Sequence, residues 1–480
     1  MDTLHHCLFL ILLSLSVLTQ LPMVKPSELD GASNMANEEL LALFEVMGDL
    51  LDDSTWVDTH PHPCTDTPWP GIQCELLPGD TLLHVTKLHV GPDVATTPAC
   101  KSNAKLSLSI LKLPHLKTLS LFNCFLKPQN VSLSSSLFTN SSVLEQLVLM
   151  SNSGLTGDIP YSLSQLTRLR VLSLSQNSFN GGIPKELGQL VKLQQLDLSY
   201  NFLTGEIPQE IGGLTSLTIL DLSWNQLSGS IPSSLGQLSS LQKMDLSFNK
   251  LGGNVPRDLG SLKKLVLLDL SRNSISGPIP DTLSQLENLQ YFLIENNPIK
   301  TNIPSFVGAL KKLLVLGLSG CGLFGPVPDS FGSLSNLTAL SLDRNSLNGS
   351  IPSNLGALPH LGQLNLSQNH LVGEISLSSE FITRLGKRLD VRDNKELCID
   401  QKRYQNLSYY LEGAPPCIDS PKATNKPWVD QTGTGSDTSK SGMQTSDGEK
   451  GRLTIAHHLG LSDSSSLFFY FGFYFIIMYF

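Results

Sequence analysis

The sequence predicts a solenoid of the α/β class: a curved right-handed superhelix with a parallel sheet on its inner wall and 3₁₀-like turns on its outer wall. The first observation is a motif, LxxLxLxxN, that recurs at a regular spacing through most of the chain. The second is a segment LxGxIP that follows most copies. In twelve copies the last position of the motif falls on Cys124, Asn152, Asn177, Asn201, Asn225, Asn249, Asn273, Asn297, Cys321, Asn345, Asn369 and Asn394.

One copy, LDLSWN at 220–225, shows why each repeat folds in this way. Leu220 and Leu222 alternate with Asp221 and Ser223, and this period of two predicts a short strand with one buried face. Asn225 then turns the chain, and its side-chain amide can pair with buried backbone groups. Repeated at every turn, these asparagines form a ladder inside the coil. A 24-residue period of this pattern indicates leucine-rich repeats, which bury their leucines only by stacking on their neighbours.

The second half of each repeat predicts the outer wall. Gly229 permits a sharp turn, and Pro232 removes a backbone donor at a point where a helix cannot continue. Leucines follow at a spacing of three, at Leu235, Leu238 and Leu241, which suits short 3₁₀ turns.

Composition divides the chain into six segments. Residues 1–28 have the polar start and short apolar run of a secretory signal peptide. We expect an N-terminal cap at 29–80, an array of about twelve repeats at 81–395, and a C-terminal cap at 396–417. A flexible linker rich in Ser, Thr and Gly at 418–466 and a hydrophobic tail at 467–480 complete the chain.

The caps are expected to cover the terminal leucines of the array. Apolar residues follow a helical spacing at Leu40, Leu41, Phe44, Met47, Leu50 and Leu51. Because a secreted chain favours disulfides, we expect the pairs Cys64–Cys74 and Cys398–Cys417, which are close in sequence and flank the array. Cys100–Cys124 is a further candidate pair. Cys321 remains at a ladder position, where we expect a buried, unreactive thiol.

Several short motifs resemble those of a plant protein family. WPGIQC (69–74) matches the WxGVxC of the N-terminal cap in plant extracellular leucine-rich-repeat proteins, and LTGEIP, LSGSIP and LNGSIP match the plant type of repeat. LFNCF (121–125), NNPI (296–299) and RLGKRLDVRDNKELC (384–398) are similar to a smaller group, the receptor-like proteins without a kinase domain. This resemblance implies a cell-surface protein that acts beside receptor kinases in development, defence or root–microbe signalling.

Charge and motif content argue against several other functions. The chain has 33 Lys and Arg against 42 Asp and Glu, a net charge of −9, without the basic stripe of a nucleic-acid-binding protein. HPHPC (60–64) raises a metal site as an alternative, but its cysteine is better explained by a cap disulfide. The recurrent aspartates Asp197, Asp221, Asp245 and Asp269 follow the LDLS consensus without a partner base. The sequence therefore predicts neither an enzyme nor a bound cofactor.

The C-terminal tail predicts attachment to a membrane. Its fourteen apolar residues are short for a bilayer span and have nothing after them, as a glycosylphosphatidylinositol (GPI) signal requires, with Ser446 as the candidate attachment residue. A single transmembrane span is the alternative. Either reading leaves the chain without an intracellular domain and places it on the extracellular face of the plasma membrane. Glycosylation sequons lie at Asn130, Asn140, Asn336, Asn348, Asn365 and Asn406, and a glycan on Asn365 would obstruct the C-terminal part of the inner face.

The inner face offers a candidate binding surface. The strand period of two and the 24-residue spacing align Tyr200, Trp224, Phe248 and Arg272 in one column, with Lys243 and Asp245 beside it and Tyr291 further along. Exposed aromatics with an arginine are typical of binding hot spots. The alternative is that this position varies freely in such repeats and carries aromatics by chance.

Two functions fit these features. The first is a membrane-anchored receptor-like protein that binds a secreted peptide, the ectodomain of a receptor kinase, or both. The second is a secreted inhibitor of microbial enzymes that degrade the cell wall, similar to polygalacturonase inhibitors, which share this repeat type but are soluble.

Overall fold

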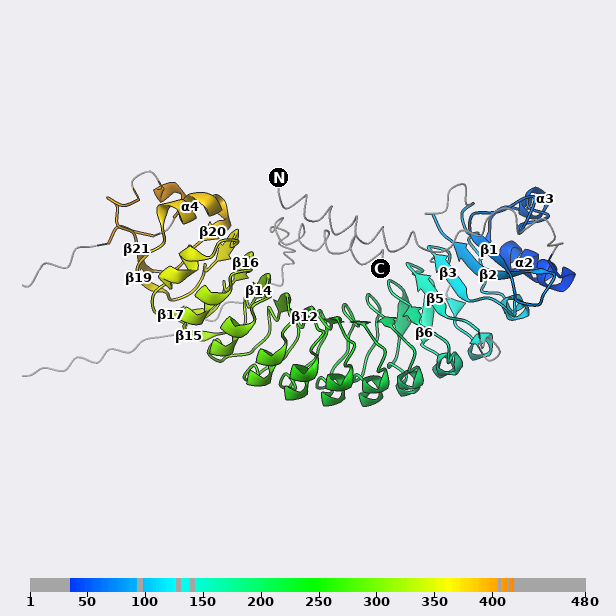
Figure 1. Cartoon of the computed structure of the whole chain (residues 1–480), viewed down its shortest axis with the longest axis horizontal. Coiled ribbons are helices and arrows are strands. Elements are labelled where there is room, and N and C mark those ends of the chain that lie inside the picture. The colour runs from blue at the N-terminus through cyan, green and yellow to red at the C-terminus, as the bar shows by residue number, and fades with distance from the viewer. Residues whose placement is uncertain are drawn as a thin grey trace, which may run out of the picture. The chain divides into compact units, whose positions relative to one another are not determined.

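The computed structural model describes residues 35–92, 98–126, 131–138, 143–404, 407–411 and 414–417. These residues belong to one compact unit, Ala32–Asp419, which is a curved solenoid (Figure 1). The predicted signal peptide, linker, tail and Ser446 lie outside the described residues, as do Asn130, Asn140 and Asn406. Among the residues that are described, no helix is long and apolar enough to cross a membrane.

A 14-stranded sheet forms the inner wall. Its first strand, β1 (Ile72–Leu76), pairs antiparallel with β2 (Leu83–Val90), and every later pair is parallel. The remaining strands, in spatial order, are β3 (Thr118–Phe122), β5 (Gln146–Met150), β7 (Val171–Ser173), β9 (Gln195–Asp197), β10 (Ile219–Asp221), β11 (Lys243–Asp245), β12 (Leu267–Asp269), β13 (Tyr291–Leu293), β14 (Val315–Gly317), β16 (Ala339–Ser341), β18 (Gln363–Asn365) and β20 (Leu389–Asp390). From β9 to β18 the register advances by one whole repeat per strand, so equivalent positions of successive repeats lie side by side.

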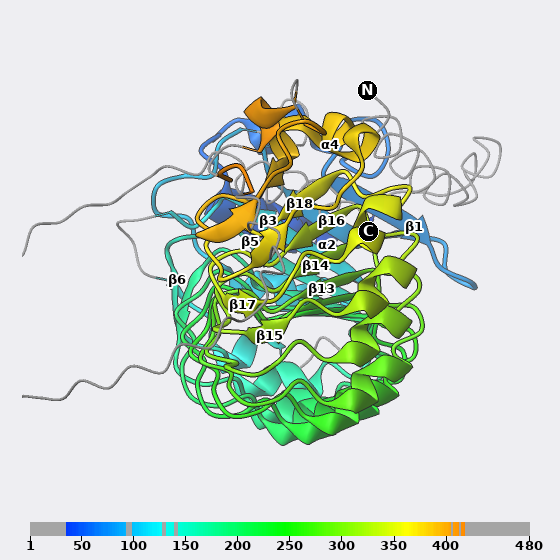
Figure 2. The same cartoon turned by 90° about the vertical axis from the view of Figure 1, so that its left-hand side faces the viewer.

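Short 3₁₀ turns form the outer wall, as the leucine spacing predicts (Figure 2). They are η2 (Leu108–Lys112), η3 (Ser135–Phe138), η4 (Tyr161–Gln165), η5 (Lys185–Gln189), η6 (Gln209–Gly213), η7 (Ser233–Gln237), η8 (Arg257–Ser261), η9 (Asp281–Gln285), η10 (Ser305–Ala309), η11 (Asp329–Ser333) and η12 (Ser353–Ala357). A proline precedes each turn from η4 to η12, and Pro232 at φ −65° sets the entry to η7. Leu235 and Leu238 of this repeat are fully buried.

Small parallel sheets join the two walls along one side. They are β4 (Val131–Ser132) with β6 (Leu155–Asp158) and β8 (Ser178–Asn180), β15 (Phe324–Pro326) with β17 (Ser346–Asn348), and β19 (Val372–Glu374) with β21 (Glu396–Cys398). The glycine of the LxGxIP segment follows the ladder at most turns. Gly229 has a φ of 75°, a conformation that side chains strongly disfavour, which explains why glycine occupies this position.

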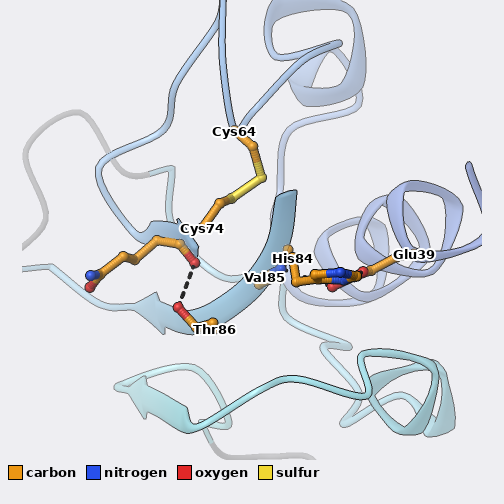
Figure 3. Close-up of a disulfide and its surroundings, with 7 residues drawn as sticks. Glu39, Cys64, Cys74, His84, Val85 and Thr86 are labelled. Carbon is orange, nitrogen blue, oxygen red and sulfur yellow. Dashed lines mark hydrogen bonds and ion pairs between the residues drawn. A yellow bond between two sulfur atoms is a disulfide. The ribbon is translucent and has the colours of Figure 1, made fainter. Parts of the chain in front are cut away.

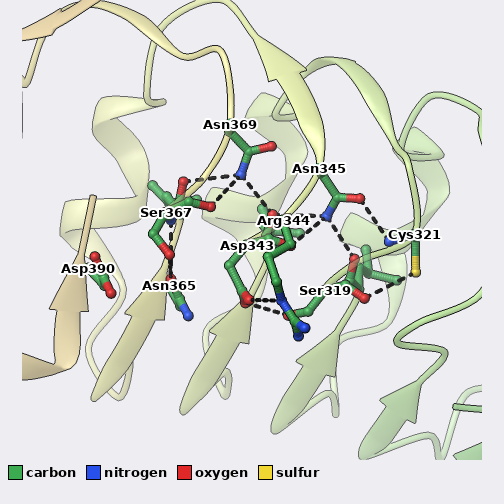
Figure 4. A network of polar contacts seen from close by, with 12 residues as sticks. Ser319, Cys321, Asp343, Arg344, Asn345, Asn365, Ser367, Asn369 and Asp390 are labelled. Atoms are coloured by element: carbon green, nitrogen blue, oxygen red, sulfur yellow. Dashed lines mark hydrogen bonds and ion pairs between the residues drawn. The ribbon is translucent and has the colours of Figure 1, made fainter. Parts of the chain in front are cut away.

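The asparagine ladder forms as predicted. Nδ2 of Asn225 donates to the carbonyl of Leu198 in the preceding repeat at 2.9 Å, and its Oδ1 accepts from the backbone N–H of Leu203 at 3.0 Å. Cys321 occupies the same position with its thiol buried and its Sγ 3.3 Å from the carbonyl of Ile294 (Figure 4). Burial raises the pKa of this thiol to about 12, in agreement with an unreactive structural cysteine.

The N-terminal cap consists of α2 (Asn37–Leu50), α3 (Trp56–Thr59) and the β1–β2 hairpin. The helix buries Leu43, Met47 and Leu50 against the array. Leu41 is 66% exposed, so its assignment to the apolar face is wrong. Position 41 lies about 200° from position 43 around the helix, so its side chain is opposite the face that packs on the array.

The C-terminal cap replaces the final 3₁₀ turn with a regular helix, α4 (Ser379–Leu385), followed by η13 (Gly386–Arg388), β20, β21 and η14 (Ser408–Tyr410). The buried Tyr404 donates its hydroxyl to the carbonyls of Ile375 and Leu377 and closes the last coil.

All three expected disulfides are present: Cys64–Cys74, Cys100–Cys124 and Cys398–Cys417. The first excludes Cys64 as a free metal ligand and joins the segment before the hairpin to β1 (Figure 3). Cys124 thus holds a ladder position and a cap disulfide at the same time.

Candidate functional site

The predicted column of aromatics forms a continuous stack across three repeats. The rings of Tyr200 and Trp224 are parallel within 13° with centroids 5.1 Å apart, and those of Trp224 and Phe248 are parallel within 14° at 3.7 Å. The guanidinium carbon of Arg272 lies 4.9 Å from the centre of the Phe248 ring and covers that end of the stack. We call these four residues the aromatic column.

The backbone places this column differently from the sequence prediction. The strands end three residues before it, at Asp197, Asp221, Asp245 and Asp269, so strand alternation does not set the direction of these side chains. Each member of the column instead has a φ of 53–54°, in the left-handed region. Every repeat uses this conformation just before its ladder position, because the chain must turn there to direct the ladder side chain inward. The alignment of the column is confirmed, and its cause is the turn rather than the strand.

The recurrent aspartates beside the column complete local turns at the strand ends. Oδ1 of Asp221 accepts from both the backbone N–H and the hydroxyl of Ser223, at 3.1 and 2.7 Å. The same arrangement recurs at Asp197 and Asp245. Asp221 and Ser223 point away from the leucine core yet are buried, so alternation predicts their direction and not their exposure. These contacts support a structural role for the recurrent carboxylates.

Lys243 is the cation among these aspartates. Its Nζ donates to Oδ2 of Asp221 at 2.8 Å and lies 3.9 Å from Oδ2 of Asp245. Burial opposes its charge, but the two carboxylates outweigh burial and raise the pKa of Lys243 above its usual value. The ammonium group of Lys243 is therefore already paired with carboxylates of the protein. This pairing weakens the sequence prediction that Lys243 contacts a ligand.

Concentrated negative charge perturbs the carboxylates. Burial, followed by repulsion from Asp221, raises the pKa of Asp197. The same two causes raise the pKa of Asp245 well above its usual range. Burial raises the pKa of Asp269 to about 6. Burial, followed by repulsion from Asp221, also raises the pKa of Tyr200 to about 12. The aspartates therefore act electrostatically on the aromatic column.

Beyond Arg272, the inner face carries Tyr291 and the carboxylate of Glu295. Tyr291 lies on β13 in the register position of Lys243 and Leu267, and the row of recurrent aspartates lies between this position and the aromatic column. Burial raises the pKa of Glu295 to about 7, and repulsion from Asp269 contributes. The carboxylate of Glu295 occupies the space above Gly317, whose missing side chain leaves room for it. Sequence reasoning missed Glu295, because only the glycine in the next repeat explains where its side chain goes.

A polar network continues toward the C-terminal cap (Figure 4). The hydroxyl of Ser319 donates to Asp343, and Nε of Arg344 donates to the same carboxylate at 2.9 Å. Asn365 takes the place of the recurrent aspartate, and its Oδ1 accepts from the backbone N–H and hydroxyl of Ser367. This sequon lies on the inner sheet, whereas Asn336 and Asn348 are exposed elsewhere.

Comparisons with known proteins agree with the repeat architecture. A family model described as a leucine-rich repeat region matches residues 115–273. A second model, described as a leucine-rich repeat, matches residues 264–286, 312–334 and 336–358.

Curated relatives come from Arabidopsis thaliana. Receptor like protein 29 is 43% identical over 147 residues, which are 30% of this chain and 31% of that protein. Piriformospora indica-insensitive protein 2 is 37% identical over 32% of this chain and 35% of its own length. Protein TOO MANY MOUTHS is 33% identical over 30% of this chain and 28% of its own length. The matched regions thus span about a third of each relative.

Solved structures with the same fold include plant receptor ectodomains. The complex PEPR1–AtPEP1 superposes with a TM-score of 0.61 at 33% identity and covers 76% of this chain and 49% of that one. The leucine-rich-repeat ectodomain of the Arabidopsis receptor kinase HAESA, in complex with an extended IDA peptide hormone, gives a TM-score of 0.61 at 29% identity, over 76% of this chain and 58% of that one. Together with the repeat geometry, these matches show that the chain has the leucine-rich-repeat fold and is similar to plant receptor-like proteins and receptor ectodomains.

Proposed function

We propose that this chain is an extracellular receptor-like protein that captures a secreted peptide or a receptor-kinase ectodomain on the aromatic column. The exposed stack of Tyr200, Trp224 and Phe248 with Arg272 at its end is the observation that carries the proposal. Trp224 is 39% exposed, and its indole N–H makes no hydrogen bond to any described residue. It can therefore donate to an acceptor on a partner.

Folding stability alone does not account for the column. A bulky residue in the left-handed region costs about 1–2 kcal/mol, so three of them cost about 3–6 kcal/mol. Each aromatic pair returns about 0.5–1.5 kcal/mol beyond its buried area, or about 1–3 kcal/mol for two pairs. Some other repeats fill the same position with residues that tolerate this backbone better, such as Asn123, Asn296 and Gly320, whereas Gln176, Arg344 and Gln368 do not. The difference favours a role outside folding.

The geometry also limits how a partner can bind. Because the ring faces cover one another, a partner meets the ring edges, where aromatic hydrogens carry partial positive charge. An extended peptide lying along the column would place backbone carbonyls or apolar side chains against these edges. Arg272, which makes no salt bridge to a described residue, offers a cation at one end for a carboxylate of the partner.

Anchoring and location form part of the same proposal. The three disulfides favour an oxidising compartment, as expected of a secreted protein. We propose that the tail at 467–480 holds the protein on the outer face of the plasma membrane through a GPI anchor. Release by phosphatidylinositol phospholipase C supports this anchor, whereas release by detergent alone supports a span. A protein that is soluble without either treatment would favour the inhibitor function instead.

A capture experiment tests the binding site. Tagged protein is incubated with a panel of purified receptor-kinase ectodomains, each with and without synthetic secreted peptides. We expect Tyr200→Ala with Trp224→Ala to abolish capture of a partner that the native protein binds. The matched control is Phe202→Ala, which removes an aromatic ring that is 51% exposed in the same repeat but outside the stack. Equal capture by the double variant, or equal loss in the control, would remove the aromatic column from the site.

A second pair of variants compares two arginines at the same repeat position. Arg272→Ala removes the cation at the end of the stack, and Arg344→Ala removes one that instead pairs with Asp343. We expect the first to weaken capture and the second to leave it close to native.

A further inference from the structure

A histidine in the N-terminal cap has carboxylates at both of its ring nitrogens. Nδ1 of His84 lies 2.9 Å from Oε2 of Glu39, and Nε2 lies 2.8 Å from Oδ2 of Asp80. His84 is on β2, and Glu39 is in the first turn of α2 (Figure 3). The imidazole therefore connects α2 to β2, the strand at which parallel pairing of the sheet begins.

These two contacts indicate the charge on the ring. Carboxylates at these distances can only accept hydrogen bonds, and a neutral imidazole has one N–H to donate. Both contacts are hydrogen bonds only when His84 carries two N–H groups and a positive charge. The side chains of His84 and Glu39 are 9% and 4% exposed, so water cannot replace a lost contact easily.

The surroundings of the ring add few competing charges. The ring of His115 packs against it with centroids 4.2 Å apart. Glu75, opposite His84 in the β1–β2 register, is paired with Lys117 at 2.6 Å. The other oxygen of Glu39 accepts from the backbone N–H of Val85 at 2.8 Å. Glu39 thus joins the charge on the ring to the backbone of β2.

We propose that Glu39, His84 and Asp80 form a pH-sensitive clasp, which holds the first turn of α2 on β2 under acidic conditions and loosens it as the ring loses its proton. The apolar face of α2 stays in the core, so the change is a local opening rather than undocking of the helix. When the ring is neutral, one nitrogen presents a lone pair to a carboxylate, and the resulting repulsion acts on Glu39 or Asp80. Loss of the Glu39 contact also frees the N–H of Val85.

The direction of the effect follows from the protonation of the two states. Burial disfavours the charged ring, but the hydrogen bonds of Asp80 and Glu39 outweigh burial and raise the pKa of His84. The stabilisation is complete below the unfolded value of about 6.5 and is lost as the pH rises through the higher folded value. The cap is therefore tighter in acid than at neutral or alkaline pH.

Hydrogen exchange of the full-length secreted protein tests the clasp. Exchange of segment 37–50 is measured by mass spectrometry between about pH 5.5 and pH 8, corrected for intrinsic rates and compared with 219–245 in the middle of the array. We expect protection of the cap segment to fall several-fold as the pH rises through the folded pKa of His84. Protection of the reference segment 219–245 should not change with the midpoint at which His84 titrates.

Three variants separate the clasp from other titrations. His84→Gln should abolish the pH dependence in the cap segment, and Asp80→Asn should shift its midpoint to lower pH while keeping the contact with Glu39. His115→Gln, the matched control on the neighbouring ring, should retain the native profile. Native protection that is independent of pH, a native profile in Asp80→Asn, or its loss in His115→Gln would overturn the proposal. None of these three results needs a change at His84, so a folding defect there cannot obscure them.

Discussion

Replacing Asn225 with alanine tests how much the asparagine ladder stabilises the array. Oδ1 of Asn225 accepts from the N–H of Leu203 at 3.0 Å, and Nδ2 donates to the carbonyl of Leu198 at 2.9 Å and to those of Leu222 and Ser223 at 3.2 Å each. Removal of the amide affects these groups unequally. The three carbonyls each keep a second donor from a neighbouring repeat or turn, whereas the N–H of Leu203 loses its partner.

The expected loss follows from that single N–H group. An unpaired buried donor costs about 1–3 kcal/mol, and we expect Asn225→Ala to lower the free energy of unfolding by about 2 kcal/mol. Asn225→Cys should cost about as much, because a thiol can donate to the carbonyls but is a poor acceptor for the N–H of Leu203. Asn225→Asp should cost more, because a carboxylate oxygen would face the carbonyl of Leu198 without a proton between them.

Cys321 supplies the matched control, because the fold already tolerates a thiol there. The equivalent N–H in the preceding repeat belongs to Ile299, and it donates to the carbonyl of Asn297 at 2.9 Å within the turn NNPI. No acceptor is therefore needed at position 321, and Cys321→Ala removes only a weak donor. We expect it to cost less than about 1 kcal/mol.

Urea unfolding of the purified protein, followed by circular dichroism, measures these differences. The reasoning is refuted if Asn225→Ala costs no more than Cys321→Ala at an unchanged slope, because the unpaired N–H would then carry no measurable penalty.

Two other substitutions probe charge and packing. Lys243→Met removes the cation among the buried aspartates, and breaking a buried pair costs about 3–5 kcal/mol at neutral pH. The pKa of Asp269 is raised to about 6, so the stability that comes from its protonation is present below about pH 4 and is lost as the pH rises through 6. Urea unfolding should therefore show a smaller loss of stability in Lys243→Met at pH 4.5 than at pH 7. An equal loss at the two pH values would contradict this reasoning. Gly188→Ala would place a Cβ 2.1 Å from the carbonyl oxygen of Glu210 in the next repeat, at an expected cost of about 1–3 kcal/mol or more in the same assay. Gly48→Ala, with open space in the interior of α2, is its control and should stabilise by about 0.5–1 kcal/mol; a similar loss in both variants would show that steric contact is not the cause.

The repeat pattern predicts those features that depend on one residue type at one position. Leu220, Asn225 and Gly229 each meet a backbone requirement that recurs once in every repeat, so their roles follow from spacing alone. The three disulfides follow in the same way from position and from the expected compartment. The alignment of Trp224 with its neighbours was predictable for this reason as well.

Features that depend on the neighbouring repeat could not be predicted in this way. The left-handed backbone conformation at Trp224 could not be predicted from the sequence, because Tyr, Trp, Phe and Arg do not favour that conformation. The burial of Asp221 depends on side chains of the repeats on both sides, such as Lys243. The position of Glu295 depends on the absence of a side chain at Gly317. His84 and Glu39 are 45 residues apart, with no repeat period to align them.

The groups with raised pKa values in the array and in the N-terminal cap change the stability in the same direction as the pH rises. Asp269 and Glu295 in the array have raised pKa values because burial disfavours their charge, and repulsion from other carboxylates adds to this effect. His84 in the cap has a raised pKa because two carboxylates favour its charge. In both cases the folded state binds protons more tightly than the unfolded state, so stability falls as the pH rises.

Other groups oppose this trend only weakly. Hydrogen bonds to Thr55 lower the pKa of Asp53, and a hydrogen bond to His84 lowers that of Asp80, but both carboxylates lie where solvent screens their interactions. Two independent arrangements therefore reduce the stability of the folded state as the pH rises. One loosens the cap as the pH rises through the pKa of His84, and the other adds negative charge beside the aromatic column near pH 6–7. A partner that brings a cationic group to the column should consequently bind more tightly as the pH rises, while the cap that covers the array becomes less stable.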